Sequence, residues 1–207
     1  MDNYERSAIA ARELFLKWDQ EKMIAKYGLE SDENYLYIRF LGEKYRIERR
    51  IGTVENIQNG IAAAEFDSVM VIYDYLCREN TIPGMCGEWV RTHSLKNAGQ
   101  ASPDDVKMYR KRADRLQQNL PALRYAAGQI GRPFFKGDIA FVFPIFDGME
   151  GVFQFWEGDE EFPPSVRFLW DDNIHHCLKF ETVWYVAGRV FELLDMHMGN
   201  FGGNSTV

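Results

Sequence analysis

The feature that most constrains the fold of this chain is an apolar stripe near its C-terminus. Its residues recur at spacings of three and four, the period of one helix face, and they are Phe180, Val183, Trp184, Ala187, Val190, Phe191 and Leu194. The spacing predicts a helix over residues 180–196. Because burying each large apolar side chain is worth about 1.5–3 kcal/mol, this helix requires a broad apolar surface to pack on.

Three segments upstream supply such a surface. Residues 139–143 and 151–156 have the apolar and aromatic composition of buried strands, and Asp147-Gly148 between them is typical of a turn. Residues 165–170 predict a third strand. We therefore expect the C-terminal helix to pack on a sheet that contains these segments.

The N-terminal half predicts a helix followed by strands. Residues 4–27 contain no Gly or Pro, and Gly28 then provides a stop, so we expect one helix over this range. The runs 35–40 and 44–48 are rich in aromatic and β-branched residues, which predicts a β-hairpin. A further strand is expected near 51–57.

Additional helices are predicted over residues 66–77, from Ser102-Pro103 onward and from Pro121 to about Gly128. Because the strands cluster without regular alternation with helices, the predicted fold class is α+β. We expect a largely antiparallel sheet packed against several helices, with long N-terminal and C-terminal helices. One domain over residues 1–207 is expected, with a frayed tail at 199–207.

Composition limits the compartment and the partners. Three cysteines without a CxxC spacing, Cys77, Cys86 and Cys177, predict neither a disulfide framework nor an iron–sulfur site. The N-terminus lacks a signal-peptide pattern and no run of 18 apolar residues occurs, so we expect a cytoplasmic protein that does not span a membrane. The net charge of −7 disfavours nucleic acid as a partner. The oligomeric state is left open.

Charge of opposite sign is concentrated in two adjacent segments. Residues 106–136 hold eight basic residues and one acidic residue, whereas residues 137–172 hold nine acidic residues and one basic residue. Basic residues form a stripe on the helix expected after Ser102: Lys107, Arg110, Lys111 and Arg115. Three interpretations stay open for this stripe: it binds an anion or an acidic partner, it is a solvated face, or it pairs with the acidic segment.

An acidic loop follows the strand that ends at Trp156. Consecutive carboxylates at Asp159, Glu160 and Glu161 precede the pair Pro163-Pro164, which restricts the loop and removes two backbone donors. A rigid acidic loop is suited to binding a hard cation through oxygen ligands, or to general acid–base work. The alternative is a turn whose charges are solvated.

A second polar segment contains Glu88, Trp89, Arg91 and His93. A histidine beside a cation and a carboxylate is a conceivable general base, although no nucleophile partner is visible and a structural histidine is the alternative. In both this segment and the acidic loop, a carboxylate stands next to a tryptophan at the edge of an apolar body. We therefore hypothesise that residues 88–93 and 157–164 lie close together and frame a site.

The run His175-His176-Cys177 is a candidate for metal ligation. On a strand, adjacent residues face opposite ways, so the two histidines would not chelate together. His175 and Cys177 would share a face, with Cys86 as a distant third ligand, yet clear ligand pairs are missing. We expect no tightly bound transition metal there, and the sequence indicates no particular cofactor.

The run Gly158-Asp159-Glu160-Glu161-Phe162-Pro163-Pro164-Ser165, followed by a strand and a helix from about Phe180, resembles the bacterial and archaeal family called domain of unknown function 3786. The segment 87–90 and the helix at 66–77 are similar to that family as well. The family has no assigned activity, so the resemblance implies no catalytic residues. Some members are linked to corrinoid methyl-transfer systems in anaerobes and are fused to an iron–sulfur-type module.

This chain lacks a cysteine cluster, so a redox role would require a separate redox or corrinoid protein as partner. The interpretation that follows is an accessory or binding domain that serves corrinoid or redox metabolism. The alternative is a small-molecule enzyme whose pocket is formed by the 157–164 loop and the 88–93 segment. A deep pocket with converging polar groups favours an enzyme, whereas an exposed apolar or charged patch favours a binding module.

Overall fold

The structure is a computed structural model, and it describes residues 3–79, 84–96, 98 and 105–202. The α-helices in chain order are α1 (Asn3–Lys17), α2 (Gln20–Tyr27), α3 (Phe66–Leu76), α4 (Asp105–Met108), α5 (Arg110–Leu116), α6 (Leu120–Ile130), α7 (Ile174–Cys177) and α8 (Phe180–Gly199). Single 3-10 turns occur at η1 (Thr92–Ser94) and η2 (Gln117–Asn119).

The strands form two antiparallel five-stranded sheets, with orders β1-β2-β3-β4-β5 and β6-β10-β9-β8-β7. The strands of the first sheet are β1 (Glu30–Ser31), β2 (Tyr35–Phe40), β3 (Glu43–Glu48), β4 (Val54–Asn56) and β5 (Ala62–Ala63). Those of the second are β6 (Trp89–Arg91), β7 (Arg132–Pro133), β8 (Ile139–Phe146), β9 (Met149–Trp156) and β10 (Ser165–Asp171). The α+β fold class is thus confirmed, with two sheets where one was expected.

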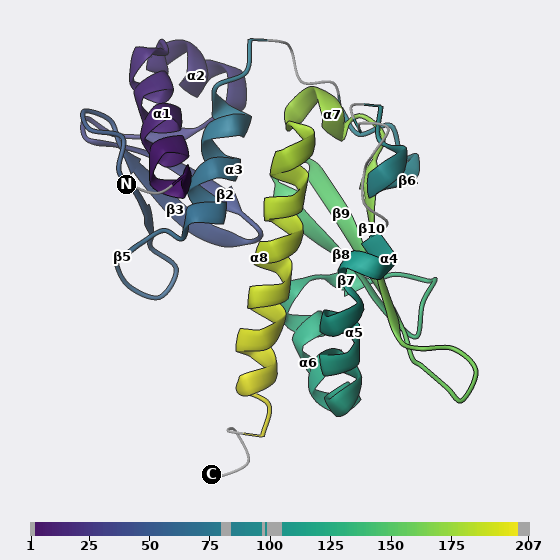
Figure 1. Cartoon of the computed structure of the whole chain (residues 1–207). Coiled ribbons are helices and arrows are strands. Elements are labelled where there is room, and N and C mark those ends of the chain that lie inside the picture. The colour runs from purple at the N-terminus through teal and green to yellow at the C-terminus, as the bar shows by residue number, and fades with distance from the viewer. Residues whose placement is uncertain (1–2, 80–83, 97, 99–104, 203–207) are drawn as a thin grey trace.

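Helix α8 runs lengthwise between the two sheets (Figure 1). The predicted stripe is confirmed, because Val183, Ala187, Val190 and Leu194 have no exposed surface. Phe191 packs edge-on against rings of the second sheet, with its centroid 5.5 Å from that of Phe168. The helix therefore contributes many of the side chains of the hydrophobic core.

The N-terminal helix expected over 4–27 is two helices. Helix α1 ends at Lys17, and Asp19 begins α2 by accepting a hydrogen bond from the N–H of Lys22 at 3.1 Å. An aspartate in this position caps a new helix better than it continues an old one. The predicted stop at Gly28 is confirmed, since Gly28 has the left-handed φ of 61° of a C-cap.

The predicted hairpin is confirmed as β2 and β3, joined by Leu41 and Gly42 with φ of 51° and 80°. Positive φ at both turn residues is the geometry of a two-residue hairpin loop. The N–H of Leu41 also donates to the C=O of Ile145 at 3.0 Å. The hairpin tip of the first sheet is thus bonded to β8 of the second.

Other expectations have mixed outcomes. The strands at 139–143, 151–156 and 165–170 are confirmed as β8, β9 and β10, and the helix at 66–77 as α3. The start of a helix at Ser102 and the outer part of the tail, 203–207, lie outside the described residues. No helix in the described part of the chain is long and apolar enough to cross a membrane.

Candidate ligand-binding cleft

Both polar segments singled out in the sequence belong to the second sheet. Strand β6 pairs with the end of β10, where Trp89 lies opposite Asp171 and Arg91 opposite Leu169. The acidic loop leaves the other end of β10, where Ser165 pairs with Trp156. In Figure 1 the loop that follows β9 extends away from β6 and α7.

The hypothesis that residues 88–93 and 157–164 frame one site is therefore wrong in its geometry. Asp171 lies six positions after Ser165, which at a rise of about 3.3 Å per residue is roughly 20 Å of strand. The physical reason is the register, because the edge strand β6 pairs with the far end of β10. The role of each segment in binding stays a prediction.

The acidic loop is held by its own hydrogen bonds. Asp159 accepts from the N–H groups of Phe162 and Glu161 at 2.7 and 2.9 Å, and these bonds lower its pKa. The loop neck is tied to η2, since the N–H of Gly158 donates to Gln117 at 2.6 Å. Glu160 is exposed. Asp159 thus shapes a turn, which is the simpler of the interpretations drawn from the sequence.

The tryptophan and the first carboxylate of this loop are engaged with neighbouring cations. The guanidinium of Arg167 lies 4.7 Å from the ring centroid of Trp156. Glu157 forms an ion pair of 3.0 Å with Arg124. Arg124 comes from the basic segment, as does Arg132, which pairs with Glu150 at 2.7 Å. The basic and acidic segments therefore do pair internally.

Among the described residues, the basic stripe itself forms its ion pairs with α5 and α8 and not with the acidic segment. Arg115 shares Asp195 of α8 with Arg112, and Arg110 pairs with Asp114 on its own helix. Lys107 and Lys111 are exposed. The stripe is thus partly a solvated face and partly a set of bonds to α8.

The segment around Glu88 is tied down by Asp171, a fully buried carboxylate at the end of β10. Asp171 accepts from the N–H groups of Cys86, Gly87 and Asn173 at 3.1, 2.7 and 3.0 Å. Burial alone would raise the pKa of Asp171, but these N–H donors bring it below the ordinary value. Sequence reasoning missed this residue, because its partners Cys86 and Gly87 lie more than 80 positions upstream.

The other candidates in this segment have ordinary surroundings. Glu88 accepts through its C=O from the N–H of Asp172, and the ring of Trp89 makes an edge contact with Phe134 at 6.5 Å. The side chains of Arg91 and His93 are exposed. Among the described residues, no hydrogen bond joins the side chain of His93 to another titratable side chain.

The sequence His175-His176-Cys177 lies in helix α7, not on a strand. The two imidazole rings are adjacent, with centroids 3.8 Å apart, and Cys177 is buried. Nowhere among the described residues do three His, Cys, Asp or Glu side chains gather as metal ligands. The expectation of no tightly bound transition metal stays a prediction.

A cleft of about 420 Å³ lies elsewhere, between the end of α2, the β2–β3 hairpin and the β8–β9 turn. It is lined by aromatic residues with two cations at the hairpin. The lining residues are Tyr27, Gly28, Leu29, Glu30, Tyr37, Ile38, Arg39, Lys44, Tyr45, Ile57, Tyr75, Phe146 and Asp147. None of the site residues proposed from the sequence is among them.

Aromatic rings form the wall of this cleft. Tyr75 stacks on Phe146 with centroids 3.9 Å apart and planes 10° from parallel, and Tyr27 lies 4.7 Å from Tyr75. Burial raises the pKa of Tyr75 and of Tyr45 to about 12, and it raises that of Tyr27 as well. These phenols are protonated at neutral pH, and the O–H groups of Tyr27 and Tyr45 already donate to the C=O of Tyr75 and to Glu43. They therefore contribute ring surface to the cleft rather than a base.

The two cations of the cleft are cross-strand neighbours. Arg39 on β2 lies directly opposite Lys44 on β3, and both side chains are exposed. Like charges in directly opposed positions destabilise a sheet. Glu30 and Asp147 also line the cleft, yet no recorded ion pair in the described part of the chain joins either of them to these cations.

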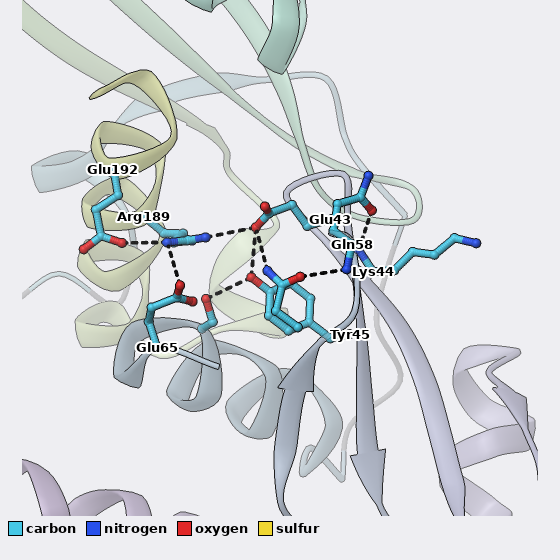
Figure 2. A network of polar contacts seen from close by, with 9 residues as sticks. Glu43, Lys44, Tyr45, Gln58, Glu65, Arg189 and Glu192 are labelled. Carbon is cyan, nitrogen blue, oxygen red and sulfur yellow. Dashed lines mark hydrogen bonds and ion pairs between the residues drawn. The ribbon is translucent and has the colours of Figure 1, made fainter. Parts of the chain in front are cut away.

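One wall of the cleft is connected to α8 through a polar network (Figure 2). Tyr45 donates its O–H to Glu43 at 3.0 Å, and the same carboxylate oxygen accepts from Arg189 of α8 at 3.0 Å. Arg189 also pairs with Glu192 at 2.8 Å and with Glu65 at 3.4 Å. This cluster therefore joins the first sheet, the start of α3 and α8.

Asp67 of α3 adds a further carboxylate beside this cluster. Burial, and secondarily the charge of Glu192, raise the pKa of Asp67 from the ordinary 3.8 to about 6, against the opposing effect of Arg189. Between about pH 4 and pH 6 Asp67 is thus more protonated in the folded protein than in the unfolded chain. The contribution of Asp67 to the free energy of unfolding must fall as the pH rises through this window.

Replacing Asp67 by Asn should therefore stabilise the protein above pH 6. We expect a gain of about 1–2 kcal/mol in the free energy of unfolding at pH 8, after allowance for solvent screening of a partly exposed carboxylate. Below pH 4 the variant and the parent should be equal. Urea denaturation from pH 4 to pH 8 measures both.

Glu13→Gln is the matched control, since it removes one carboxylate from the exposed surface of α1. It should leave the pH dependence of stability unchanged. An Asp67→Asn variant that follows the same pH profile as the parent would show that Asp67 does not titrate in this window.

Sequence reasoning missed the cleft because its walls come from segments far apart in the chain. The sequence pattern predicts Tyr37 and Tyr45 on strands and Tyr75 on a helix, and it contains nothing that brings the three together. A usable signal was present in the hairpin, where Arg39 and Lys44 interrupt aromatic runs symmetrically about Leu41-Gly42. Two cations at mirrored hairpin positions face each other.

Comparisons with known proteins agree with the resemblance seen in the sequence. A sequence model of the family described as "Domain of unknown function (DUF3786)" matches residues 19–192 of the 207. No curated protein and no solved structure matches the chain. The match spans the described residues from the cap of α2 to the middle of α8, so the chain belongs to the DUF3786 family.

Proposed function

We propose that this chain is an accessory domain that binds a small anionic molecule with a flat ring system in the tyrosine-lined cleft. The observation that carries the proposal is the cleft itself. Its volume of about 420 Å³ lies within the range of small-molecule sites, and its walls combine aromatic rings with charged side chains and other polar groups.

The charge of the ligand follows from the hairpin. Arg39 and Lys44 stand opposite each other, and neither side chain has a recorded ion pair with another described residue. An anion placed between them would relieve their mutual repulsion and satisfy both donors. The rings of Tyr27 and Tyr37, which are only partly buried, would then cover the flat part of the ligand.

A binding role is favoured over an enzymatic one by the kinds of side chain that line the cleft. The phenols of Tyr45 and Tyr75 are protonated at neutral pH even at the ordinary tyrosine pKa, and burial raises their pKa further, so neither serves as a base there. Among the described residues, neither a cysteine nor a histidine lines the cleft. The polar groups there can orient a ligand, and no pair among them has the geometry of a nucleophile with its base.

The resemblance suggests where such a domain would act. We propose that it serves corrinoid or redox metabolism together with a separate protein that carries the corrinoid or the redox centre. The cleft suits a compound of one to three fused rings and is too small for a macrocycle. The macrocycle would therefore belong to the partner.

Titration with 1-anilinonaphthalene-8-sulfonate, a flat ring system with an anionic group, tests the proposal by fluorescence. We expect saturable binding at one site in the parent protein. The double variant Arg39→Ala/Lys44→Ala should weaken it at least tenfold, about the loss of one or two charge-assisted hydrogen bonds. Native mass spectrometry of protein from its host should show a bound small anion that the double variant lacks.

Lys136→Ala is the control, because it removes one exposed cation from the connection between β7 and β8, which does not line the cleft. It should bind the probe as the parent does. The proposal falls if the parent shows no saturable binding, or if the double variant and Lys136→Ala bind equally well.

A further inference from the structure

The main chain of Arg39 points out of the sheet edge that borders the cleft. Lys44, its partner on β3, uses its own backbone on the opposite side: its C=O accepts from the N–H of Ile57 at 2.8 Å, and its N–H donates to Gln58 at 3.2 Å. Both groups of Lys44 therefore face β4. In an antiparallel ladder this makes Arg39 and Lys44 a non-hydrogen-bonded pair, so the N–H and C=O of Arg39 face away from β3.

On that free side, β1 ends before it reaches Arg39. Its register pairs Glu30 with Tyr37, so the next hydrogen-bonded partner of β2 would be Gly28 opposite Arg39. Gly28 instead caps α2, and its N–H bonds to the C=O of Ile24. No backbone hydrogen bond from another described residue is recorded for the N–H or C=O of Arg39.

We propose that the cleft reads its ligand through this open edge, with the N–H and C=O of Arg39 bonding to an amide-like edge of a flat heterocycle. The inference rests on the proposed function of the cleft and specifies its ligand class. Adjacent backbone donor and acceptor groups complement a ring that carries an acceptor next to a donor. Unpaired backbone groups of this kind are costly when a ligand buries them without a partner, which gives selectivity.

The same ligand must carry an anion for Arg39 and Lys44, whose side chains leave the sheet next to this edge. The rings of Tyr27 on α2 and Tyr37 on β2 also line the cleft. A flat heterocycle with an amide edge, joined to a phosphate, combines these three chemistries. The ligand class is therefore a nucleotide.

Amide hydrogen exchange followed by NMR tests the role of the backbone, with flavin mononucleotide as the probe. Its ring has an amide edge, and it carries a phosphate. We expect the amide of Arg39 to exchange rapidly in the free protein and at least tenfold more slowly in the complex. The amide of Ile38, which faces β3, is the internal control and should be protected in both states.

A pair of variants isolates the N–H group from the side chain. Arg39→Ala removes the guanidinium, and Arg39→Pro removes the guanidinium and the N–H, which is tolerated on an edge where the N–H faces outward. We expect Arg39→Pro to bind flavin mononucleotide about 5–10-fold more weakly than Arg39→Ala, the value of one hydrogen bond. Binding of 1-anilinonaphthalene-8-sulfonate, which lacks an amide edge, should not differ between them.

The outcomes separate this inference from the proposed function. If both probes bind while the amide of Arg39 stays unprotected, the reading through the main chain is wrong and the binding function stands. If only the sulfonate binds, the nucleotide class is wrong. If neither probe binds the parent, both proposals fall. The exchange measurement decides the matter even where Arg39→Pro does not fold.

Discussion

Replacing Arg189 by Met is expected to cost about 3 kcal/mol or more in the free energy of unfolding. The side chain of Arg189 is only 10% exposed, and that of its partner Glu43 is 13% exposed. Removing one member of a buried ion pair leaves the other charge uncompensated, which costs more than the pair contributes. Urea denaturation at pH 7 measures the loss.

Two further variants separate this effect from lost packing. Glu192→Gln breaks an ion pair whose acidic side chain is 48% exposed, so it should cost less than about 1 kcal/mol. Adding Glu43→Gln to Arg189→Met removes the stranded charge and should recover part of the stability. An Arg189→Met protein as stable as the parent, or a double variant with no recovery, would contradict this account of the cluster.

Asp171→Asn is expected to cost about 2–4 kcal/mol. The carboxylate of Asp171 accepts three backbone N–H groups with its two oxygens, and an amide has only one oxygen to offer. At least one buried N–H would then face an NH₂ group, which leaves both unsatisfied. The stabilisation by Asp171 should be present at neutral pH and lost in acid as the pH falls through its lowered pKa.

Asp172→Asn is the matched control for this prediction. Asp172 pairs with the exposed Lys96 at 2.6 Å, and such a pair contributes less than about 1 kcal/mol. Limited proteolysis should locate the damage, because Asp171 holds Cys86 and Gly87 against the end of β10. Faster cleavage near residues 84–88 is expected for Asp171→Asn alone. Equal losses in the free energy of unfolding of the two variants would contradict the proposed role of Asp171 in holding this segment.

The elements that the sequence pattern predicted correctly are those that depend on residues within a single segment. The α8 stripe, the β2–β3 hairpin and the three strands of the second sheet were predicted because each depends on residues within one segment. The break at Asp19 was missed, since the run without Gly or Pro hid a capping residue inside it. The confirmed family resemblance likewise depended on the short run at 158–165.

Pairings between distant segments were beyond the sequence. The register of β6 against β10 decides that Glu88 lies far from the acidic loop, and no pattern within either segment encodes that register. The cleft depends on how α2, the hairpin and the β8–β9 turn meet. Its two cations are present in the sequence, but only the folded sheet shows that they lie opposite each other on β2 and β3.

The strand order of the second sheet has a consequence for how the protein is made. Thr92, just after β6, bonds to Trp170 of β10, which lies 78 residues later in the chain. A ribosome adds about 5–20 residues per second, so β6 emerges roughly 4–16 s before its partner. The hairpins of the first sheet close over much shorter stretches and can form during that delay. Strand β6, the first strand of the second sheet to be synthesised, therefore cannot pair until β10, the last one, has been synthesised.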